Sequence, residues 1–309
     1  MYQPEILVTP KNVEAVRRLI DAGADAVLIG EQHFGLRLAG EFTRKDVEEA
    51  VRIAHEKGAK VYVAVNALFH NDRLNDVPGY LRFLRDANVD AIVFSDPGVL
   101  MVARETAPEL TLFWHGETTG TNWYSINFWG KKGARRAAVA REINLDAILE
   151  IKEKAEIEIE VQVHGMMPMF QSKRTLVGNY FEYQGKNLAI ETTGPDRQMF
   201  LYDPERNAKY PIFEDENGTH IMSAKDVCMI DELEDLLEAK IDCFKIEGIF
   251  KTTEYMEKVI QLYREAISLY FKDSELYRAK KETFLEQIKR IQPPERELDT
   301  GFFFKETVY

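Results

Sequence analysis

Short apolar, β-branched runs alternate with helical patterns along most of this chain, and this alternation restricts its fold more than any other feature. Residues 26–30 (AVLIG) are apolar at every position, as expected of a strand buried on both faces of a parallel sheet. A helical pattern follows at 43–58, with Thr43 as its N-cap and Gly58 at its end. Strand, helix and parallel strand form the βαβ unit, so the sequence predicts an α/β fold.

The strand–helix unit recurs eight times. The predicted strands are 5–8, 26–30, 60–66, 91–95, 110–115, 137–141, 158–164 and 243–247, and the predicted helices are 12–22, 43–58, 77–87, 98–106, 123–129, 145–154, 232–239 and 253–270. Eight units predict a closed (β/α)8 barrel of the TIM type. An open doubly wound sheet is the alternative, but that fold usually carries a glycine-rich phosphate loop after strand one, where this chain has Thr9-Pro10-Lys11-Asn12.

The strand–helix repeat is interrupted once after strand seven, and it ends before a C-terminal segment of different pattern. Residues 166–224 are rich in polar residues and turn formers, which predicts a large insertion after strand seven. We therefore expect a barrel over 1–270 that includes this insertion, and a helical extension over 271–309 with its helix at 274–291. The extension ends in Phe302-Phe303-Phe304, which is apolar enough to require packing or an interface.

Composition excludes several classes of protein. A net charge of -12 argues against broad nucleic-acid binding, although Lys131, Lys132, Arg135 and Arg136 form a basic cluster. We expect this cluster to be a solvated helix end that could also touch RNA. No apolar run is long enough to span a membrane and no signal peptide is visible, so a cytoplasmic protein is expected.

Polar residues follow the predicted strands at the ends where barrel proteins bind ligands. They are Glu31 and His33, Asn66, Asp96, His115 and Glu117, Arg141 and Glu142, His164, and Lys245 and Glu247. Each could be a helix cap or an ion-pair partner, but their recurrence predicts a pocket. We take Glu31, His115, Glu117, Glu142, His164 and Glu247 as catalytic candidates, and Asn66, Asp96, Asn122, Arg141 and Lys245 as ligand-binding candidates.

Several chemistries are open to this set. His115, Glu117, Glu142 and His164 could ligate zinc or iron. Glutamates such as Glu31 could act as general acids or bases, and Arg141 suits capture of a carboxylate or phosphate. No G-x-S-x-G motif is present to support a serine hydrolase.

The motifs resemble those of the U32 family of collagenase-like peptidases, whose better understood members hydroxylate RNA bases and ubiquinone precursors. The resemblance rests on Phe34-Gly35-Leu36-Arg37, Asp96-Pro97-Gly98-Val99-Leu100, Asn122 with Asn127-Phe128-Trp129, Ala140-Arg141-Glu142, Val161-Gln162-Val163-His164-Gly165 and Phe244-Lys245-Ile246-Glu247-Gly248. It extends over about residues 5–270.

The chain departs from the family at its cysteines. The family pattern implies four, but Pro168 and Thr175 stand in two of the places, none lies near 192–194, and Cys228 alone stands where the fourth belongs. A [4Fe–4S] cluster needs about four thiolates, so we expect no iron–sulfur cluster in this chain. The second cysteine, Cys243, begins an apolar strand and is expected in the core.

Because it lacks most of the family's cysteines, this chain is similar to the cysteine-poor partner in a known pair of paralogues. The resemblance implies a role in prephenate-dependent 5-hydroxylation of the tRNA wobble uridine, with a cluster-bearing paralogue and tRNA as partners. Prephenate, a small carboxylated molecule, would then be a co-substrate facing Arg141 and Lys245. The alternatives are a peptidase, as the family name implies, and a noncatalytic scaffold subunit.

Overall fold

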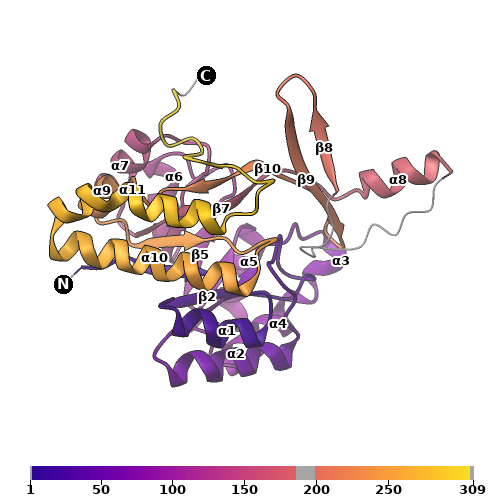
Figure 1. Ribbon diagram of the computed structural model, residues 1–309. Coiled ribbons are helices and arrows are strands. Elements are labelled where there is room, and N and C mark those ends of the chain that lie inside the picture. The colour runs from indigo at the N-terminus through magenta and orange to yellow at the C-terminus, as the bar shows by residue number, and fades with distance from the viewer. Residues whose placement is uncertain (1, 186–198, 307–309) are drawn as a thin grey trace.

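The chain folds into a closed barrel of eight parallel strands surrounded by helices (Figure 1). The structure is a computed structural model that describes residues 2–185 and 199–306. The barrel strands are β1 (Glu5–Val8), β2 (Ala26–Ile29), β3 (Lys60–Val65), β4 (Ala91–Phe94), β5 (Leu112–His115), β6 (Ala134–Ala138), β7 (Glu158–Ser172) and β11 (Cys243–Ile246). The barrel closes because β11 pairs in parallel with both β1 and β7. The predicted (β/α)8 barrel is confirmed.

Helices surround the barrel. They are α1 (Val13–Asp21), α2 (Arg44–Glu56), α3 (Asn71–Leu74), α4 (Val77–Asp86), α5 (Pro97–Thr106), α6 (Trp123–Lys131), α7 (Leu145–Lys154), α9 (Glu234–Glu238) and α10 (Thr253–Lys272). All of them except the short α3 bury residues against the barrel. In α2 the predicted cap Thr43 forms a capping box with Asp46, which satisfies two free N–H groups at the start of the helix. Most of the core lies between these helices and the strands.

The inside of the barrel is filled by side chains, as in other barrels of this type. One cluster there contains the buried side chains of Leu7, Tyr62, Phe113 and Cys243. Cys243 is therefore a core residue, and burial raises the pKa of its thiol well above the usual value. Polar side chains lie on either side of this cluster, at the amino end and at the carboxyl end of the barrel.

Strand six lies earlier than predicted. The prediction was 137–141, whereas β6 is Ala134–Ala138, and Arg136 lies inside the amino end of the barrel. Its guanidinium binds Glu5 at 2.6 Å and Glu158 at 2.7 Å and lies over the ring of Phe113. The predicted solvated cluster therefore loses Arg136, because two carboxylates and an aromatic ring make its burial possible.

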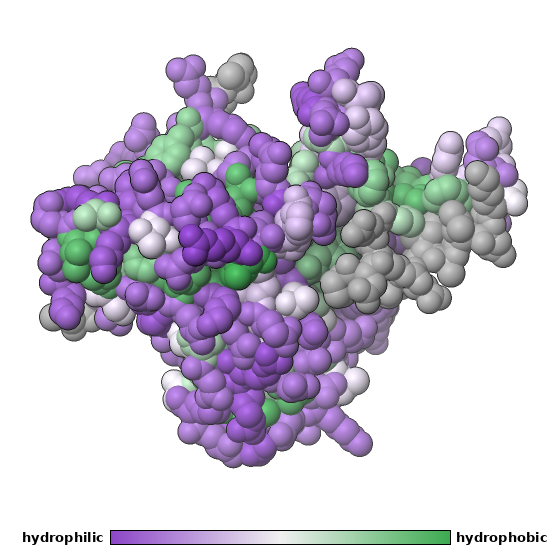
Figure 2. All heavy atoms as spheres, in the orientation of Figure 1, coloured by the Kyte–Doolittle hydropathy of each residue, from purple (hydrophilic) through white to green (hydrophobic). Residues whose placement is uncertain are grey.

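The predicted insertion is an arm that grows out of the barrel without a break in the strand. Strand β7 continues past the barrel wall to Ser172, where β10 (Gly218–Cys228) pairs with it in antiparallel fashion. β9 (Ala208–Asp215), β8 (Phe200–Asp203) and the short helix α8 (Leu176–Tyr183) complete the arm. Figure 2 shows hydrophobic residues on the surface around α8 and beside this hairpin. Residues 186–198 of the predicted insertion lie outside the described residues.

The C-terminal extension packs back on the barrel. Helix α11 (Ser274–Ile291) lies against α10 and buries Tyr277, Phe284 and Ile288, and β12 (Leu298–Asp299) pairs with β10. Of the aromatic triplet, Phe303 is buried, whereas Phe302 and Phe304 are exposed. Within residues 2–185 and 199–306, no helix is both long and apolar enough to cross a membrane.

Candidate functional site

A polar pocket opens at the carboxyl ends of the barrel strands. Its charged and amide side chains are Arg37, Asn66, His115, Glu117, Arg141, Lys245 and Glu247. They follow β2, β3, β5, β6 and β11, so strands far apart in the sequence each contribute one or two groups. The structure thus brings together six of the eleven predicted residues.

On one side of the pocket, the carboxylate of Glu117 contacts three other side chains. Its Oε2 accepts from Arg37 Nη2 at 2.5 Å and lies 3.6 Å from Arg141 Nη1, while its Oε1 lies 3.3 Å from His115 Nδ1. Burial alone would raise the pKa of this carboxyl, but His115, Arg37 and Arg141 together hold it well below its usual value. Glu117 is therefore ionised throughout the physiological range and is unsuited to act as a general acid.

His115 lies between Arg141 and Glu117. Arg141 Nη2 lies 3.0 Å from His115 Nε2, and a guanidinium can only donate, so Nε2 accepts. On the other side of the ring, Nδ1 lies 3.3 Å from Glu117 Oε1 and 3.4 Å from the Glu117 backbone nitrogen. A ligand that draws Arg141 away would leave the Nε2 lone pair without its donor in the pocket.

Glu247 and Lys245 form the opposite side. Lys245 Nζ lies 3.1 Å from Glu247 Oε2, and Thr9 Oγ1 donates to Glu247 Oε1 at 2.6 Å. The backbone N–H groups of Gly248 and Ile249 also donate to Oε1. Burial would raise the pKa of Glu247, but Lys245 and the Thr9 hydroxyl outweigh it, so the pKa is lowered.

The charges of the pocket do not cancel. Arg37, Arg141 and Lys245 are cationic, and only Glu117 and Glu247 are anionic, which leaves one positive charge in excess among the described lining residues. Arg37 and Lys245 each bind a carboxylate directly. Arg141 instead donates to the neutral Gln162 at 2.9 Å, and its carboxylate contact, to Glu117, is long. Arg141 is thus the group best placed to receive an anionic ligand.

The loop between β2 and α2 covers the pocket. Asn66 Oδ1 accepts from the N–H of Leu36 at 2.9 Å, and the next residue, Arg37, holds a positive φ of 52° that turns its side chain into the barrel. The cavity beneath has a volume of about 30 Å³, enough for a few water molecules. A larger ligand needs more space than the structure leaves there.

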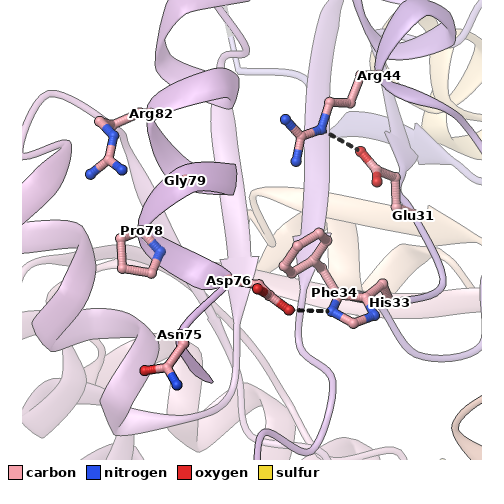
Figure 3. Close-up of a pocket in the computed structure, with 9 residues that line it drawn as sticks. All are labelled: Glu31, His33, Phe34, Arg44, Asn75, Asp76, Pro78, Gly79 and Arg82. Atoms are coloured by element: carbon pink, nitrogen blue, oxygen red, sulfur yellow. Dashed lines mark hydrogen bonds and ion pairs between the residues drawn. The ribbon is translucent and has the colours of Figure 1, made fainter. Parts of the chain in front are cut away.

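The other five predicted residues lie elsewhere, four of them on loops or helix starts and the fifth, His164, on β7. Glu31 lines a separate cleft outside the barrel, where it faces Arg44 at 3.8 Å and where His33 meets Asp76 at 3.0 Å (Figure 3). Burial raises the pKa of Glu31. Asp96 caps α5 and Asn122 caps α6, the helix-cap role that the sequence also allowed. Glu142 is exposed to solvent.

His164 is turned out of the barrel by a β-bulge. Lys245 pairs with Gln162, but the next residue, Ile246, pairs with His164, so β7 carries one extra residue at this point. A bulge redirects the side chains that follow it. Gln162 therefore stays with the pocket, while His164 points into the helix layer, where its Nε2 lies 2.8 Å from the Tyr255 hydroxyl.

The metal site considered from sequence does not assemble, because Glu142 and His164 lie apart from His115 and Glu117. No group of three or more His, Cys, Asp or Glu side chains is arranged to hold a metal ion within residues 2–185 and 199–306. Cys228 is buried beside Tyr263, with a pKa raised to about 12 mainly by burial.

Sequence reasoning missed two pocket residues, Thr9 and Arg37, and also Gln162, which accepts from the pocket residue Arg141. Arg37 and Gln162 lie inside motifs that carried the family resemblance, so a signal for them was present. Thr9 directly follows β1, which pairs with β11, and its place after a barrel strand is the signal that could have found it.

The fold and the pocket together define a TIM-barrel protein that presents a charged, cation-rich site at the carboxyl ends of its strands. The sequence profile of Peptidase family U32 matches residues 11–308, and the chain belongs to this family. It is 62% identical to tRNA hydroxylation protein P2 of Bacillus subtilis (strain 168) over 309 residues, the whole length of both chains. The resemblance inferred from the motifs is confirmed.

Two further proteins extend the comparison. The chain is 33% identical over 302 residues to tRNA hydroxylation protein P1 of the same B. subtilis strain, covering 97% of this chain and 71% of that one. Among solved structures, a dihydrodipicolinate synthase has a TM-score of 0.52 at 10% identity and covers 94% of this chain and 83% of that chain. This last likeness supports the barrel fold only.

Proposed function

We propose that this chain is a tRNA-hydroxylation factor that contributes to 5-hydroxyuridine at the wobble position. The names of its relatives support the reaction class, since both B. subtilis relatives are tRNA hydroxylation proteins. The wobble position is our extension, drawn from the family resemblance in the motifs.

The ligand of the barrel pocket is proposed to be a small carboxylate, with prephenate as the co-substrate. The observation that carries this is Arg141, a half-buried guanidinium that donates to neutral partners in a pocket with one positive charge in excess. A guanidinium can bind a carboxylate through two parallel hydrogen bonds. The Arg37 loop would open to admit the molecule and close over it.

The proposed reaction requires a redox centre in addition to the pocket. Replacing C5–H of uridine by C5–OH is a two-electron oxidation, and the described side chains of the pocket are not redox carriers. We therefore propose that the oxidation uses an electron acceptor outside this chain, that a cluster-bearing paralogue carries the two electrons to this acceptor, and that this chain supplies the pocket. The presence of both P1 and P2 in one B. subtilis strain supports such a pair.

Neither alternative from the sequence is favoured by the geometry. A serine or cysteine peptidase would need its nucleophile, and the described pocket is lined by neither Ser nor Cys; its two glutamates, Glu117 and Glu247, have lowered pKa values, which does not suit the general acid of a carboxylate peptidase. A noncatalytic scaffold would not need an arginine kept free of strong carboxylate bonds.

Gene deletion combined with nucleoside analysis of tRNA tests the hydroxylation role. Deletion of the gene should abolish or sharply reduce 5-hydroxyuridine in total tRNA, measured by mass spectrometry of nucleosides. Restoring the gene as Arg141→Ala should fail to recover the modification, whereas the exposed-arginine control Arg17→Ala should recover it. Unchanged 5-hydroxyuridine in the deletion strain would overturn the proposal.

Ligand binding is tested on purified protein by isothermal titration with prephenate, alone and with the paralogue added. Arg141→Ala should weaken binding by roughly 10- to 100-fold, the loss expected for a charge-assisted hydrogen bond. Equal affinity in wild type and variant would place the carboxylate elsewhere.

A further inference from the structure

A second cavity lies at the root of the arm, beside the mouth of the barrel. It has a volume of about 120 Å³ and is lined by Met166, Met199, Phe200, Lys209, Pro211, Phe250, Lys251, Pro293, Glu295 and Arg296. These residues come from β7, the β8–β9 hairpin, the loop after β11 and the C-terminal tail, so the site exists only in the folded chain.

The walls of this cavity suit a flat ring. Phe200, Phe250 and the two prolines offer apolar surface, and Lys209 Nζ lies 4.7 Å from the centre of the Phe200 ring. A cavity of about 150 Å³ is enough to hold benzene. At about 120 Å³ this cavity is somewhat smaller, but it is partly open to solvent, so a single six-membered ring can enter it without being fully enclosed.

The rim of the cavity is cationic. Lys251 and Arg296 both bind the buried carboxylate of Asp226, two positive charges on one negative, and Lys209 has no ion pair among the described residues. Even with Glu295 counted, one positive charge remains in excess. An aromatic slot with a surplus cation is the combination that binds a nucleobase and its phosphate.

We propose that this cavity binds one unpaired pyrimidine nucleotide of the RNA substrate, with the base on Phe200 and its phosphate at Lys209. The inference rests on the proposed function and adds to it a subsite for the RNA. The cavity neighbours the barrel pocket, since Phe250 follows the pocket residue Ile249. Buried Met166 and Ile249 lie in the wall between the two cavities, so the subsite anchors a flanking nucleotide and not the reacting base.

The outer arm extends the same surface. Tyr180, Tyr183 and Tyr202 are exposed there, together with Lys173 and Arg174. Exposed aromatic rings next to basic residues are typical of single-stranded RNA binding. The arm therefore offers RNA both exposed rings and positive charge, although the net charge of the whole chain is -12.

The chain contains a matched control for this site. Phe200 is 41% exposed with Lys209 4.7 Å from its ring, and Phe302 is 40% exposed with Lys305 4.6 Å from its ring. The two pairs have the same chemistry, but the second lies on the C-terminal segment, outside the cavity. The experiment measures the affinity of labelled unmodified tRNA by fluorescence anisotropy, with and without the paralogue, at several salt concentrations.

Phe200→Ala should weaken tRNA binding by roughly 5- to 150-fold, the range for loss of one base–aromatic stack. Lys209→Ala should lower the slope of log affinity against log salt by about 1. Phe302→Ala and Lys305→Ala should leave both quantities unchanged. Equal effects of the two pairs, no effect of the first pair, or no tRNA binding with or without the paralogue would overturn the subsite.

The nucleoside measurement separates this proposal from the proposed function. If deletion of the gene abolishes 5-hydroxyuridine but Phe200→Ala binds tRNA and restores the modification normally, the function stands and the subsite is wrong. If the deletion has no effect while Phe200→Ala alone weakens tRNA binding, the subsite stands and the hydroxylation role is wrong.

Discussion

The buried imidazole of His164 should make the stability of this protein depend on pH in a window where few other groups titrate. Tyr255 donates its proton to Gln292 Oε1 at 2.5 Å, so its oxygen accepts from His164 Nε2–H. Gln292 in turn donates to Asp226 at 2.7 Å. This chain of directed hydrogen bonds keeps His164 neutral, and burial, with a smaller effect of Lys251, lowers its pKa from 6.5 to about 3.

The size of the effect follows from linkage between protonation and folding. Below pH 6.5 His164 is protonated in the unfolded chain but stays neutral in the folded chain. The free energy of unfolding therefore decreases as the pH falls toward about 3. Between pH 7 and pH 5 the loss is about 2 kcal/mol. Most carboxylates remain ionised in both states over this range, and comparison with a variant that lacks His164 isolates the contribution of this histidine from that of the other five.

Urea unfolding at pH 7 and pH 5 measures this loss in wild type and in His164→Gln, which keeps a donor for Tyr255 but cannot be protonated. The variant should be less stable at pH 7 by roughly 1 to 3 kcal/mol, yet lose about 2 kcal/mol less than wild type on acidification. The exposed His70→Gln serves as the control and should behave as wild type. Equal pH dependence of wild type and His164→Gln would refute the reasoning.

Three other changes follow from the structure. Asp226→Asn leaves Lys251 and Arg296 buried without their anion, so unfolding in urea should show a loss of about 3 to 5 kcal/mol. Arg136→Met, at the opposite end of the barrel from the pocket, should lower the melting temperature but leave the affinity for prephenate of the folded protein unchanged. Asn217 Nδ2 donates to the backbone of the covering loop at Gln32 O (2.8 Å), so Asn217→Ala should speed hydrogen exchange in residues 31–40 and weaken prephenate binding several-fold, while exchange in the barrel strands stays the same.

Most of the fold could be read from the sequence because its elements are strongly periodic. Helices at 145–154 and 274–291 were predicted to the residue, since each combines a cap with an apolar stripe. Strand six was misplaced because its basic residues look solvated, and only the carboxylates contributed by β1 and β7 make a buried Arg136 tolerable.

The pocket could be predicted only in part. Asn66, His115, Glu117, Arg141, Lys245 and Glu247 do meet there, because parallel strands bring their carboxyl ends to one edge. Glu31, Asp96, Asn122 and Glu142 share the same sequence position but point elsewhere, since the loop after each strand decides the direction of the side chain.

The sequence by itself determined the barrel, the large insertion after strand seven, the family and the low number of cysteines, because these depend on local periodicity and residue identity. Only the tertiary structure decided which polar groups face one another. A single extra residue in β7 sends His164 into the helix layer and leaves Gln162 beside Arg141. Such pairings depend on strand register and loop path between distant segments, and no local pattern in the sequence records either.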